Sequence, residues 1–359
     1  MSAPTFLVIA EGAFSPETSK TANSAIRYLP ERVVGVLDST AAGRTAQEVL
    51  GFGGAIPVVR SMDEGFALAP TAVLIGIAPA GGQLPATWRS WILAALDRGL
   101  AVWSGLHTRL GDDPELASRA RAGGAEIRDL RRSPERLTVS NGLARDVDAL
   151  VVLSVGSDCN VGKMTAQLQL VRGLNARGLR TRFVATGQTG ILIEGWGIAV
   201  DAVVADFVGG AAEQLVLEGA KGADVVLLEG QGSLVHPGYS GVTLGLMHGA
   251  CPAAMILCHQ SSRELIGDYT GRPAWVRIPP LPDLVRLYED AARPVHPSKV
   301  VGIALNTYDL SEADARASVA AARRDTGLPS CDPVREDPSP LVEAVARAHA
   351  AWKAARRSA

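Results

Sequence analysis

The sequence predicts an α/β protein with two domains, each built on a mainly parallel sheet covered by helices. Length, composition and the alternation of strand-like with helix-like segments support this prediction. A chain of 359 residues is too long for one ordinary core, and usual domain sizes suggest about two domains. Only 5% of the residues are aromatic, and the many small and β-branched residues suit parallel sheets buried between helices.

The first part of the chain alternates short apolar runs with helical patterns. Strands are expected at residues 5–10, 32–38, 72–77 and 100–104, and helices at residues 40–50, 85–98 and 113–122. Such alternation is typical of βαβ units, so a Rossmann-like domain is predicted over residues 1–140. Asp38 ends the second strand, where dinucleotide-binding folds often hold a ribose. No G-x-G-x-x-G follows the first strand, so the sequence does not favour NAD binding.

The polar segment 131–145 contains Pro134 and Gly142 and is the expected junction, which assigns residues 141–359 to the second domain. That domain is expected to begin with a strand at 149–155 and a helix at 166–176. Further strands are expected at 182–185, 203–206, 224–229, 253–258 and 300–306. The tail from Glu312 is expected to be helical with one interruption. This pattern predicts a doubly wound α/β domain.

Charge and cysteine usage narrow the class of partner. The formal net charge of -2 argues against broad attraction to nucleic acid or to an anionic membrane, so a small-molecule substrate is expected. The start of the chain has no secretory signal pattern, and no apolar run is long enough to span a membrane. The four cysteines lack CxxC spacing, and no His/Cys cluster has metal-ligand spacing. Reduced thiols, a cytoplasmic location and no metal site are therefore predicted.

A glycine-rich loop between the strand VVLSV and a helix is the strongest functional signal. In that context successive backbone N–H groups and the helix N-terminus bind a phosphate, and Lys163 neutralises it. The predicted phosphate-binding residues are Gly156, Ser157, Asn160, Val161, Gly162, Lys163, Met164 and Thr165.

Two features of the loop depart from the simplest pattern. Five residues separate its glycines instead of four, and Met164 stands where a magnesium-binding Ser or Thr normally follows the lysine. Phosphate binding is therefore better supported than magnesium-dependent phosphoryl transfer. The domain is predicted to be P-loop NTPase-like in fold.

A second strand end points to the same site. Glu229 ends the strand at 224–229 and begins the sequence EGQGS. The carboxyl ends of parallel strands face one ligand crevice in a doubly wound sheet, so Glu229 is expected near the phosphate loop. A surface glutamate in a turn is the alternative interpretation.

The loop, the EGQG sequence and the late strand ending in Asn306-Thr307 together resemble the dethiobiotin synthetase-like branch of P-loop proteins. In that branch the late Asn contacts the nucleotide base, which implies a ligand contact for Asn306. The segments GSDCNVGKMT, LEGQGSLVHPGYSGVTLGLMHG and VVGIALNT resemble a family long labelled a domain of unknown function. Members of that family include a D-glutamate N-acetyltransferase that uses acetyl-CoA. The resemblance extends from GIAPAGGQLP through the C-terminal domain.

The first domain also carries a looser resemblance. GGAIPVVRSMDEGF, AVLIGIAP and LDRGLAVWSGLH are similar to the CoA-binding domain of succinyl-CoA ligases. The resemblances together imply acetyl-CoA as co-substrate and CoA as the phosphate-bearing ligand of the loop. They also favour a homo-oligomer.

N-acetylation of an acidic amino acid needs a base, oxyanion donors and a cationic clamp. Glu229, His236 and Asp158 are the candidate bases, because Glu and His can be tuned toward neutral pH and all three follow strand ends. Gln231 and Ser233 are candidate donors. Arg263 is the candidate carboxylate clamp, since its fork binds carboxylates bidentately.

Three functions of different classes remain open from the sequence. The first is an acetyl-CoA-dependent N-acetyltransferase acting on D-glutamate. The second is an ATP- and Mg-dependent synthetase or kinase of the dethiobiotin synthetase type. The third is a nucleotide- or CoA-binding regulatory protein without turnover, which the dense polar groups of LEGQGSLVHPGYSG disfavour.

Overall fold

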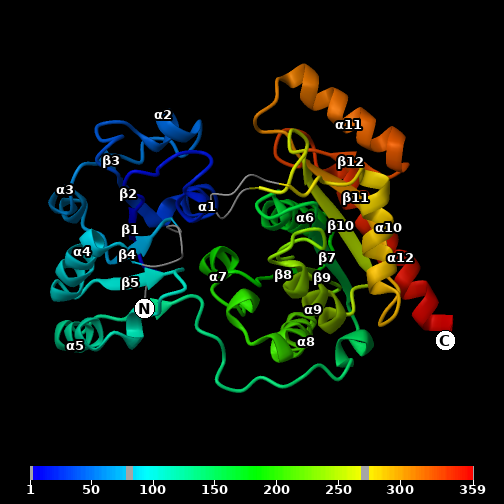
Figure 1. The fold of residues 1–359 in the computed structure, drawn as a ribbon, viewed down its shortest axis with the longest axis horizontal. Helices are drawn as coiled ribbons and strands as arrows, with labels where there is room; N and C mark the ends of the chain where they lie inside the picture. Colours follow the sequence, from blue (N-terminus) through cyan, green and yellow to red (C-terminus); the bar gives the residue numbers. More distant parts are fainter. Residues whose placement is uncertain (1–2, 78–83, 268–274, 359) are drawn as a thin grey trace. The chain divides into compact units, whose positions relative to one another are not determined.

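The computed structural model describes residues 3–77, 84–267 and 275–358, which form two compact units (Figure 1). The first unit comprises Met1–Ser133 and Ile191–Ala202, and the second comprises Pro134–Gly190 and Val203–Ala359. Part of the segment GIAPAGGQLP, residues 78–83, lies outside the described residues.

The first unit is a six-stranded parallel sheet with the strand order β3-β2-β1-β4-β5-β6. Successive strands extend from β1 to β3 on one side and from β4 to β6 on the other, so the strand order reverses between β1 and β4 as in doubly wound folds, and the Rossmann-like prediction is confirmed. Its elements are β1 (Phe6–Ile9), α1 (Lys20–Tyr28), β2 (Val33–Leu37), α2 (Ala46–Leu50), β3 (Val58–Val59), α3 (Met62–Ala67), β4 (Ala72–Ile75), α4 (Ala86–Asp97), β5 (Ala101–Ser104), α5 (Pro114–Gly123) and β6 (Ile127–Asp129).

The start of one helix in the first unit differs from the sequence expectation, and Asp38 has a structural role. The helix expected at 40–50 begins only at Ala46, because Thr45 and Glu48 form a capping box there. The Asp38 carboxylate binds the protein's own backbone: it accepts hydrogen bonds from Phe14 N (2.9 Å) and Thr40 N (2.8 Å). The acid therefore holds the loop that follows β1.

The segment Ile191–Ala202 belongs to the first unit although it lies far along the chain. Ser133 Oγ donates to Ala202 O at 3.1 Å, and Arg131 forms an ion pair with Asp201. Arg128 Nη2 also donates to Gly195 O at 3.0 Å. The chain therefore passes from the second unit into the first at residue 191 and returns after residue 202, so one boundary along the sequence does not separate the two units.

The second unit is another six-stranded parallel sheet, with the order β12-β11-β10-β7-β9-β8. This arrangement confirms the predicted P-loop α/β class. Its elements are β7 (Leu150–Gly156), α6 (Lys163–Ala176), β8 (Thr181–Val184), α7 (Gln188–Glu194, which runs on into the first unit), α8 (Val208–Gly219), β9 (Val225–Leu228), α9 (Ser240–Ala250), β10 (Ala254–Gln260), α10 (Leu281–Ala292), β11 (Lys299–Asn306), α11 (Glu312–Thr326), β12 (Ser330–Cys331) and α12 (Ser339–Ser358).

The prediction of a strand at residues 203–206 is wrong. Residues Ala205–Phe207 form a 3-10 turn that leads directly into α8. Val204, Ala205 and Asp206 are exposed, so this short apolar run has no sheet to pack against.

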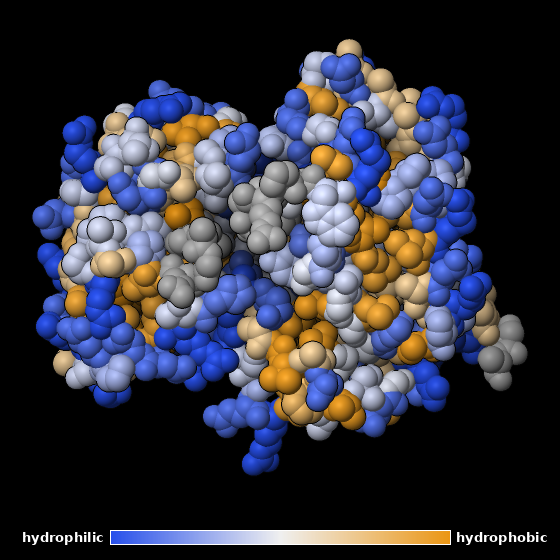
Figure 2. Space-filling model, viewed as in Figure 1, coloured by the Kyte–Doolittle hydropathy of each residue, from blue (hydrophilic) through white to orange (hydrophobic). Residues whose placement is uncertain are grey.

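Helices cover both faces of the second sheet. α6 and α12 pack on one face, where Leu170 and Val345 join a core that includes Val152, Leu227 and Ile256. α8 packs on the other face. A Cβ atom on its Gly219 would lie 2.6 Å from Val184 Cγ2 and 3.6 Å from Val226 Cγ1. Polar side chains cover much of the visible outer surface of both units (Figure 2). None of the helices in the described ranges is long and apolar enough to cross a membrane.

Candidate phosphate-binding site

The glycine-rich loop lies at the point where the strand order of the second sheet reverses. β7 is central, with β9 and β8 on one side and β10, β11 and β12 on the other. Ligands of open α/β sheets bind at the carboxyl ends of strands at such a switch point. The loop that begins at Gly156 starts at that end of β7.

The backbone of the loop is shaped to bind an anion. α6 begins at Lys163, and its N-cap is Gly162 with φ +99°, which has no side chain to cap the first turn. The N–H groups of that turn and the helix dipole are therefore presented toward the loop. Asn160 also has a positive φ of 55°. A Cβ on Gly156 would lie 2.9 Å from Val161 Cγ2, so glycine is needed there.

Lys163 joins the loop to the segment after β9. Its Nζ donates to Asp158 O at 2.7 Å and to Gly232 O at 2.9 Å. The residue is only 7% exposed, so its Nζ lies inside the site. Met164 is buried in the next position and brings no oxygen atom that could bind magnesium, while Thr165 is half-buried.

Glu229 lies beside the loop because β9 pairs directly with β7. Its Oε2 accepts bonds from Thr186 N (3.0 Å) and Gly187 N (3.1 Å), and the residue is buried. Gly230 follows, and its N–H donates to Ser154 Oγ at 2.9 Å. A Cβ on Gly230 would lie 1.6 Å from Ser154 O, so this close approach of the two strands requires glycine.

His236 has a defined tautomer. Gly238 N donates to its Nδ1 at 3.0 Å, and a backbone N–H can only donate. Nδ1 therefore carries the lone pair, and the neutral ring has its proton on Nε2. Burial lowers the pKa of His236 despite the nearby Asp158 carboxylate, which favours the neutral ring. In this arrangement Nε2 is a donor rather than a base.

Asp158 of the loop forms an ion pair with Arg263 of the segment after β10. Arg263 Nη1 donates to Asp158 Oδ2 at 2.8 Å and to Cys159 O at 2.9 Å, and its Nη2 donates to Gln260 Oε1 at 2.7 Å. Asp158 is fully buried, and its Oδ2 also accepts Gly267 N at 2.8 Å. These bonds hold the loop against the segment after β10.

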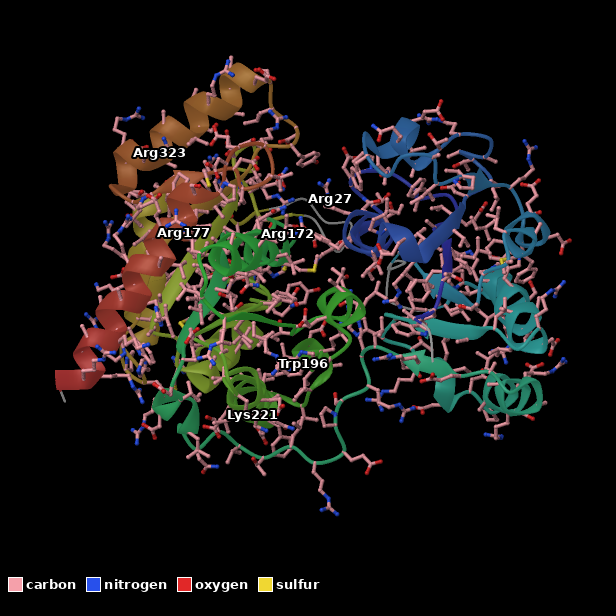
Figure 3. The ribbon with its side chains drawn as sticks, turned by 180° about the vertical axis from the view of Figure 1, so that it is seen from behind. Arg27, Arg172, Arg177, Trp196, Lys221 and Arg323 are labelled. Carbon is pink, nitrogen blue, oxygen red and sulfur yellow. The ribbon has the colours of Figure 1, made fainter. Side chains whose placement is uncertain are left out.

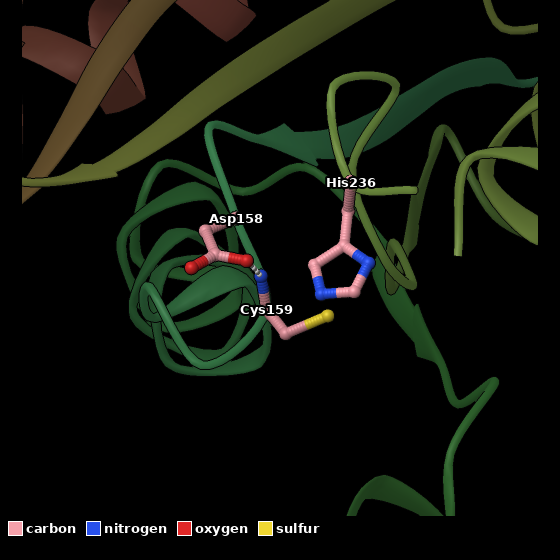
Figure 4. Close-up of side chains that lie close together, drawn as sticks. All are labelled: Asp158, Cys159 and His236. Carbon is pink, nitrogen blue, oxygen red and sulfur yellow. Dashed lines mark hydrogen bonds between the residues drawn. The ribbon is translucent and has the colours of Figure 1, made fainter. Parts of the chain in front are cut away.

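Three side chains of different chemistry meet at the loop (Figure 4). The ligand-type atoms of Asp158, Cys159 and His236 lie within 4.8 Å of one another. The sequence spacing gave no sign of this cluster. Two cations adjoin it, since Arg263 bonds the Asp158 carboxylate and Lys163 Nζ bonds the Asp158 carbonyl. The Asp158 carboxylate is already paired with Arg263, so a divalent cation in this cluster would lie beside two cationic side chains.

The remaining predicted residues also lie around the loop. Gln231 Nε2 donates to Thr186 Oγ1 at 3.1 Å, and Ser233 is buried with its Oγ accepting Val235 N at 3.3 Å. A Cβ on Gly162 would lie 3.9 Å from Asn306 Cβ, so Asn306 at the end of β11 faces the loop.

Two residues outside the predicted set of ligand contacts support the loop. Tyr288 of α10 is fully buried, and its hydroxyl donates to Gly156 O at 2.6 Å and accepts Leu234 N at 3.1 Å. His259 Nδ1 lies 2.8 Å from Ser157 Oγ. His259 comes at the end of an apolar run, where a polar residue can either cap a strand or line a crevice, and the pattern around Tyr288 gives no signal of its role.

Fold and site together define an α/β protein with a P-loop at the switch point of its second sheet. The family model "Domain of unknown function (DUF1611_C) P-loop domain" matches residues 138–342, and "Domain of unknown function (DUF1611_N) Rossmann-like domain" matches residues 39–133. The chain belongs to the DUF1611 family.

Relatives with known structures or curated names extend this assignment. A crystal structure of a DUF1611 family protein from Anabaena variabilis superposes with a TM-score of 0.91 at 37% identity, covering 96% of this chain and 100% of that one. A protein named D-glutamate N-acetyltransferase from Tritonibacter scottomollicae is 38% identical over 80% of this chain and 84% of its own length. A protein of the same name from Pseudoalteromonas sp is 34% identical, covering 79% and 83% respectively.

Proposed function

We propose that this protein transfers the acetyl group of acetyl-CoA to the amino group of D-glutamate, with the P-loop binding the CoA phosphates. The observation that carries the proposal is a P-loop in which buried Met164 follows the lysine. Such a loop suits a phosphate-bearing donor whose phosphates are held but not cleaved. The names of the two curated relatives supply the acceptor and the reaction class. We expect the reaction to take place in the cytoplasm, as the sequence predicts.

Glu229 is the base we propose among the three candidates. Asp158 is fully buried, with Oδ1 accepting Cys159 N and Oδ2 accepting Arg263 and Gly267. His236 presents a donor at Nε2. Glu229 would take one proton from the substrate ammonium, and the free amine would then attack the thioester carbonyl. The C–N bond forms, the C–S bond breaks, and the second proton lost by the nitrogen passes to the departing sulfur, so CoA leaves as the thiol and Glu229 releases the first proton to solvent.

The other polar residues would position the reactants. His236 Nε2–H and the loop N–H groups are donors for phosphate oxygens or for the developing oxyanion. We propose that Arg263 keeps the loop in shape, since its guanidinium already bonds Asp158, Cys159 and Gln260.

The competing proposal is ATP- and Mg-dependent synthetase or kinase chemistry. Glu229 at the end of β9 favours it, because that position often binds metal in P-loop proteins. Met164 disfavours it, since a thioether is a poor magnesium ligand. Thiol release from acetyl-CoA in EDTA separates the two functions when D- and L-amino acids are supplied one at a time. Release that requires D-glutamate supports the transferase. No release, together with Mg-dependent ADP formation from ATP, would overturn it.

The role of Glu229 has its own test. Glu229→Gln keeps the size of the side chain and removes its basicity. We expect kcat to fall by roughly 10²- to 10⁴-fold, the usual loss for a general base, with little change in the KM for acetyl-CoA. Unchanged turnover would remove Glu229 from the base role.

A further inference from the structure

One of the four cysteines lies in the P-loop, in an environment unlike that of the other three. Cys159 is half-buried, whereas Cys251, Cys258 and Cys331 are buried. Burial raises the pKa of Cys258 and of Cys331 to about 12, so these two thiols stay protonated at neutral pH. Peroxides oxidise accessible thiolates in preference to protonated thiols inside a core. Cys159 is therefore the cysteine placed to react.

Three positive features lie around Cys159. Arg263 Nη1 donates to Cys159 O at 2.9 Å, and Lys163 Nζ donates to Asp158 O at 2.7 Å. The third feature is the N-terminus of α6, a helix of 14 residues that begins at Lys163 and has Arg177 at its opposite end (Figure 3). The neighbouring carboxylate, Asp158, is paired with Arg263 and accepts Cys159 N at 2.7 Å. Helix N-termini and adjacent cations stabilise a thiolate.

His236 adds a hydrogen-bond donor to this environment. Its ring points toward the Cys159 thiol (Figure 4), and the ligand-type atoms of the two side chains lie within 4.8 Å of each other. His236 is only 6% exposed, and the bond from Gly238 N to Nδ1 places the proton of the neutral ring on Nε2. An N–H group here can stabilise a thiolate and can donate to the oxygen that leaves when a thiolate attacks a peroxide. The cysteine is thus part of a cluster suited to thiolate chemistry.

We propose that Cys159 is a site of reversible oxidation, at which a peroxide and a small thiol together block the P-loop. The thiolate sulfur attacks one oxygen of hydrogen peroxide. The S–O bond forms, the O–O bond breaks, and the departing hydroxide takes a proton to become water. The sulfur is oxidised by two electrons and the peroxide is reduced. Glutathione then attacks the sulfenic sulfur, the S–S bond forms, and the oxygen leaves as water with the proton of that thiol.

A mixed disulfide at Cys159 would exclude a phosphate from the loop. Gly162, the N-cap of α6, has no side chain, so the first turn of the helix is presented to the loop that carries Cys159. Glutathione bound there adds bulk and two carboxylates beside those N–H groups, and negative charge repels a phosphate. The second thiol comes from solution, because the other cysteines of the chain are buried. Control of acetyl transfer by this step rests on the proposed function, whereas the oxidation itself does not.

Trapping with dimedone, which reacts with sulfenic acids, tests the oxidation without any need for acetyl transfer. The folded protein is treated with hydrogen peroxide and dimedone near pH 7, and labelled peptides are followed by mass spectrometry. We expect Cys159 to be labelled at least about ten-fold faster than each of the other three cysteines. His236→Ala should slow this labelling roughly ten-fold, the loss expected for one hydrogen bond to a charged group. His236→Gln keeps an N–H donor and should stay within about three-fold of native.

Labelling of Cys159 no faster than that of the buried cysteines overturns the proposal. Labelling at the native rate in a folded His236→Ala protein overturns it as well, because the cluster would then have no part in the chemistry.

Activity measurements test the effect on the loop. Peroxide followed by glutathione should lower acetyl transfer by the native protein at least about ten-fold, and dithiothreitol should restore it, which oxidation of methionine would not allow. Cys159→Ser should keep its own untreated rate after the same treatment. Cys251→Ser is the matched control, because a serine hydroxyl can replace the bond from Cys251 Sγ to His248 O. It should lose activity as the native protein does.

The mass of the treated native protein gives a measurement that does not depend on how well Cys159→Ser folds. Activity should fall in step with the addition of one glutathione per chain, on the peptide that contains Cys159. Inactivation without that adduct, equal inactivation of a folded Cys159→Ser protein, or full activity of the adduct overturns the proposal. If the untreated native protein transfers no acetyl group, the proposed function fails, and dimedone trapping still decides whether Cys159 is the oxidised residue.

Discussion

Ser157 Oγ lies 2.8 Å from His259 Nδ1, and this contact joins the phosphate loop to the end of the neighbouring strand β10. The backbone makes a second link nearby, where Ser157 N donates to Cys258 O at 3.0 Å. Burial, with the nearby Arg263 guanidinium, lowers the pKa of His259 to about 4. Ser157 itself is fully buried, so the pair supports the loop and does not offer a nucleophile to substrate.

This contact predicts an acid-sensitive contribution to stability. His259 is neutral in the folded chain at pH values where the unfolded chain, with a pKa near 6.5, binds a proton. The contribution is therefore present above about pH 6.5 and is lost as the pH falls toward 4. Between pH 7 and 5 the loss from this group is about 2 kcal/mol at most.

His259→Gln should flatten that dependence. Denaturant unfolding at both pH values measures the free energy of unfolding of each protein. The native chain should lose more stability than the variant on acidification. His248→Gln, at a half-buried histidine that bonds Ala291 O, is the control and should keep the native slope. Identical slopes for native protein and His259→Gln would contradict the assignment.

The Asp158–Arg263 pair predicts strong coupling between the loop and the segment after β10. Arg263→Ala leaves a buried carboxylate without its cation and should destabilise the protein by about 3 kcal/mol. Combining it with Asp158→Asn should cost less than the sum of the single changes, with a coupling energy of roughly 1–3 kcal/mol. Arg277→Ala breaks an exposed ion pair with Glu264 and should stay within about 0.5 kcal/mol.

Kinetics of Arg263→Lys distinguish loop support from substrate binding. If Arg263 positions the loop, the KM for acetyl-CoA rises and that for D-glutamate stays near its native value. The opposite pattern would show that the residue clamps the substrate carboxylate, as the sequence suggested.

The sequence predicted the parts of the site that are local in the chain. The loop from Gly156 to Thr165 is recognisable because glycines, a lysine and a strand-to-helix transition occur within a few residues. Glu229 is recognisable because a buried strand ends in an acid. The strand expected at 203–206 shows the limit of this reasoning, since a short apolar run also precedes a buried helix.

The parts that could not be predicted depend on contacts between distant residues. Tyr288 and Gly156 are 132 residues apart, and Arg263 and Asp158 are 105 apart. Nothing in the local pattern around Tyr288 distinguishes it from an ordinary core residue. The tautomer of His236 also depends on a folded turn, because Gly238 N reaches Nδ1 only there.

The tautomer of His236 predicts that a neutral donor can replace it. His236→Ala should lower kcat/KM for acetyl-CoA by roughly ten- to one-hundred-fold, the loss expected for one hydrogen bond to a charged group. His236→Gln retains an N–H donor and should stay within about three-fold of native. His296→Ala, whose ring contacts Pro252 O at 3.2 Å, is the control. A loss of 10²-fold or more in both His236 variants would instead indicate a general base.

The cysteines give a chemical probe of the loop. Burial raises the pKa of Cys258 and of Cys331 to about 12, and burial also raises the pKa of Cys251. These thiols stay protonated and unreactive in the folded protein. Cys159 is half-buried, lies in the phosphate loop and adjoins the cations of the site. Iodoacetamide at about pH 8 should therefore modify Cys159 in preference to the other three.

CoA should slow this modification, because a ligand on the loop covers the thiol. Peptide mass spectrometry at increasing times, with and without CoA, measures both the site and the rate. Cys159→Ser should take up no label while folded, and the same protein unfolded in denaturant should label its other cysteines. Fast labelling of Cys258 or Cys331 in the folded protein would contradict the burial described above. Labelling of Cys159 at the same rate with saturating CoA would place the CoA phosphates away from this loop.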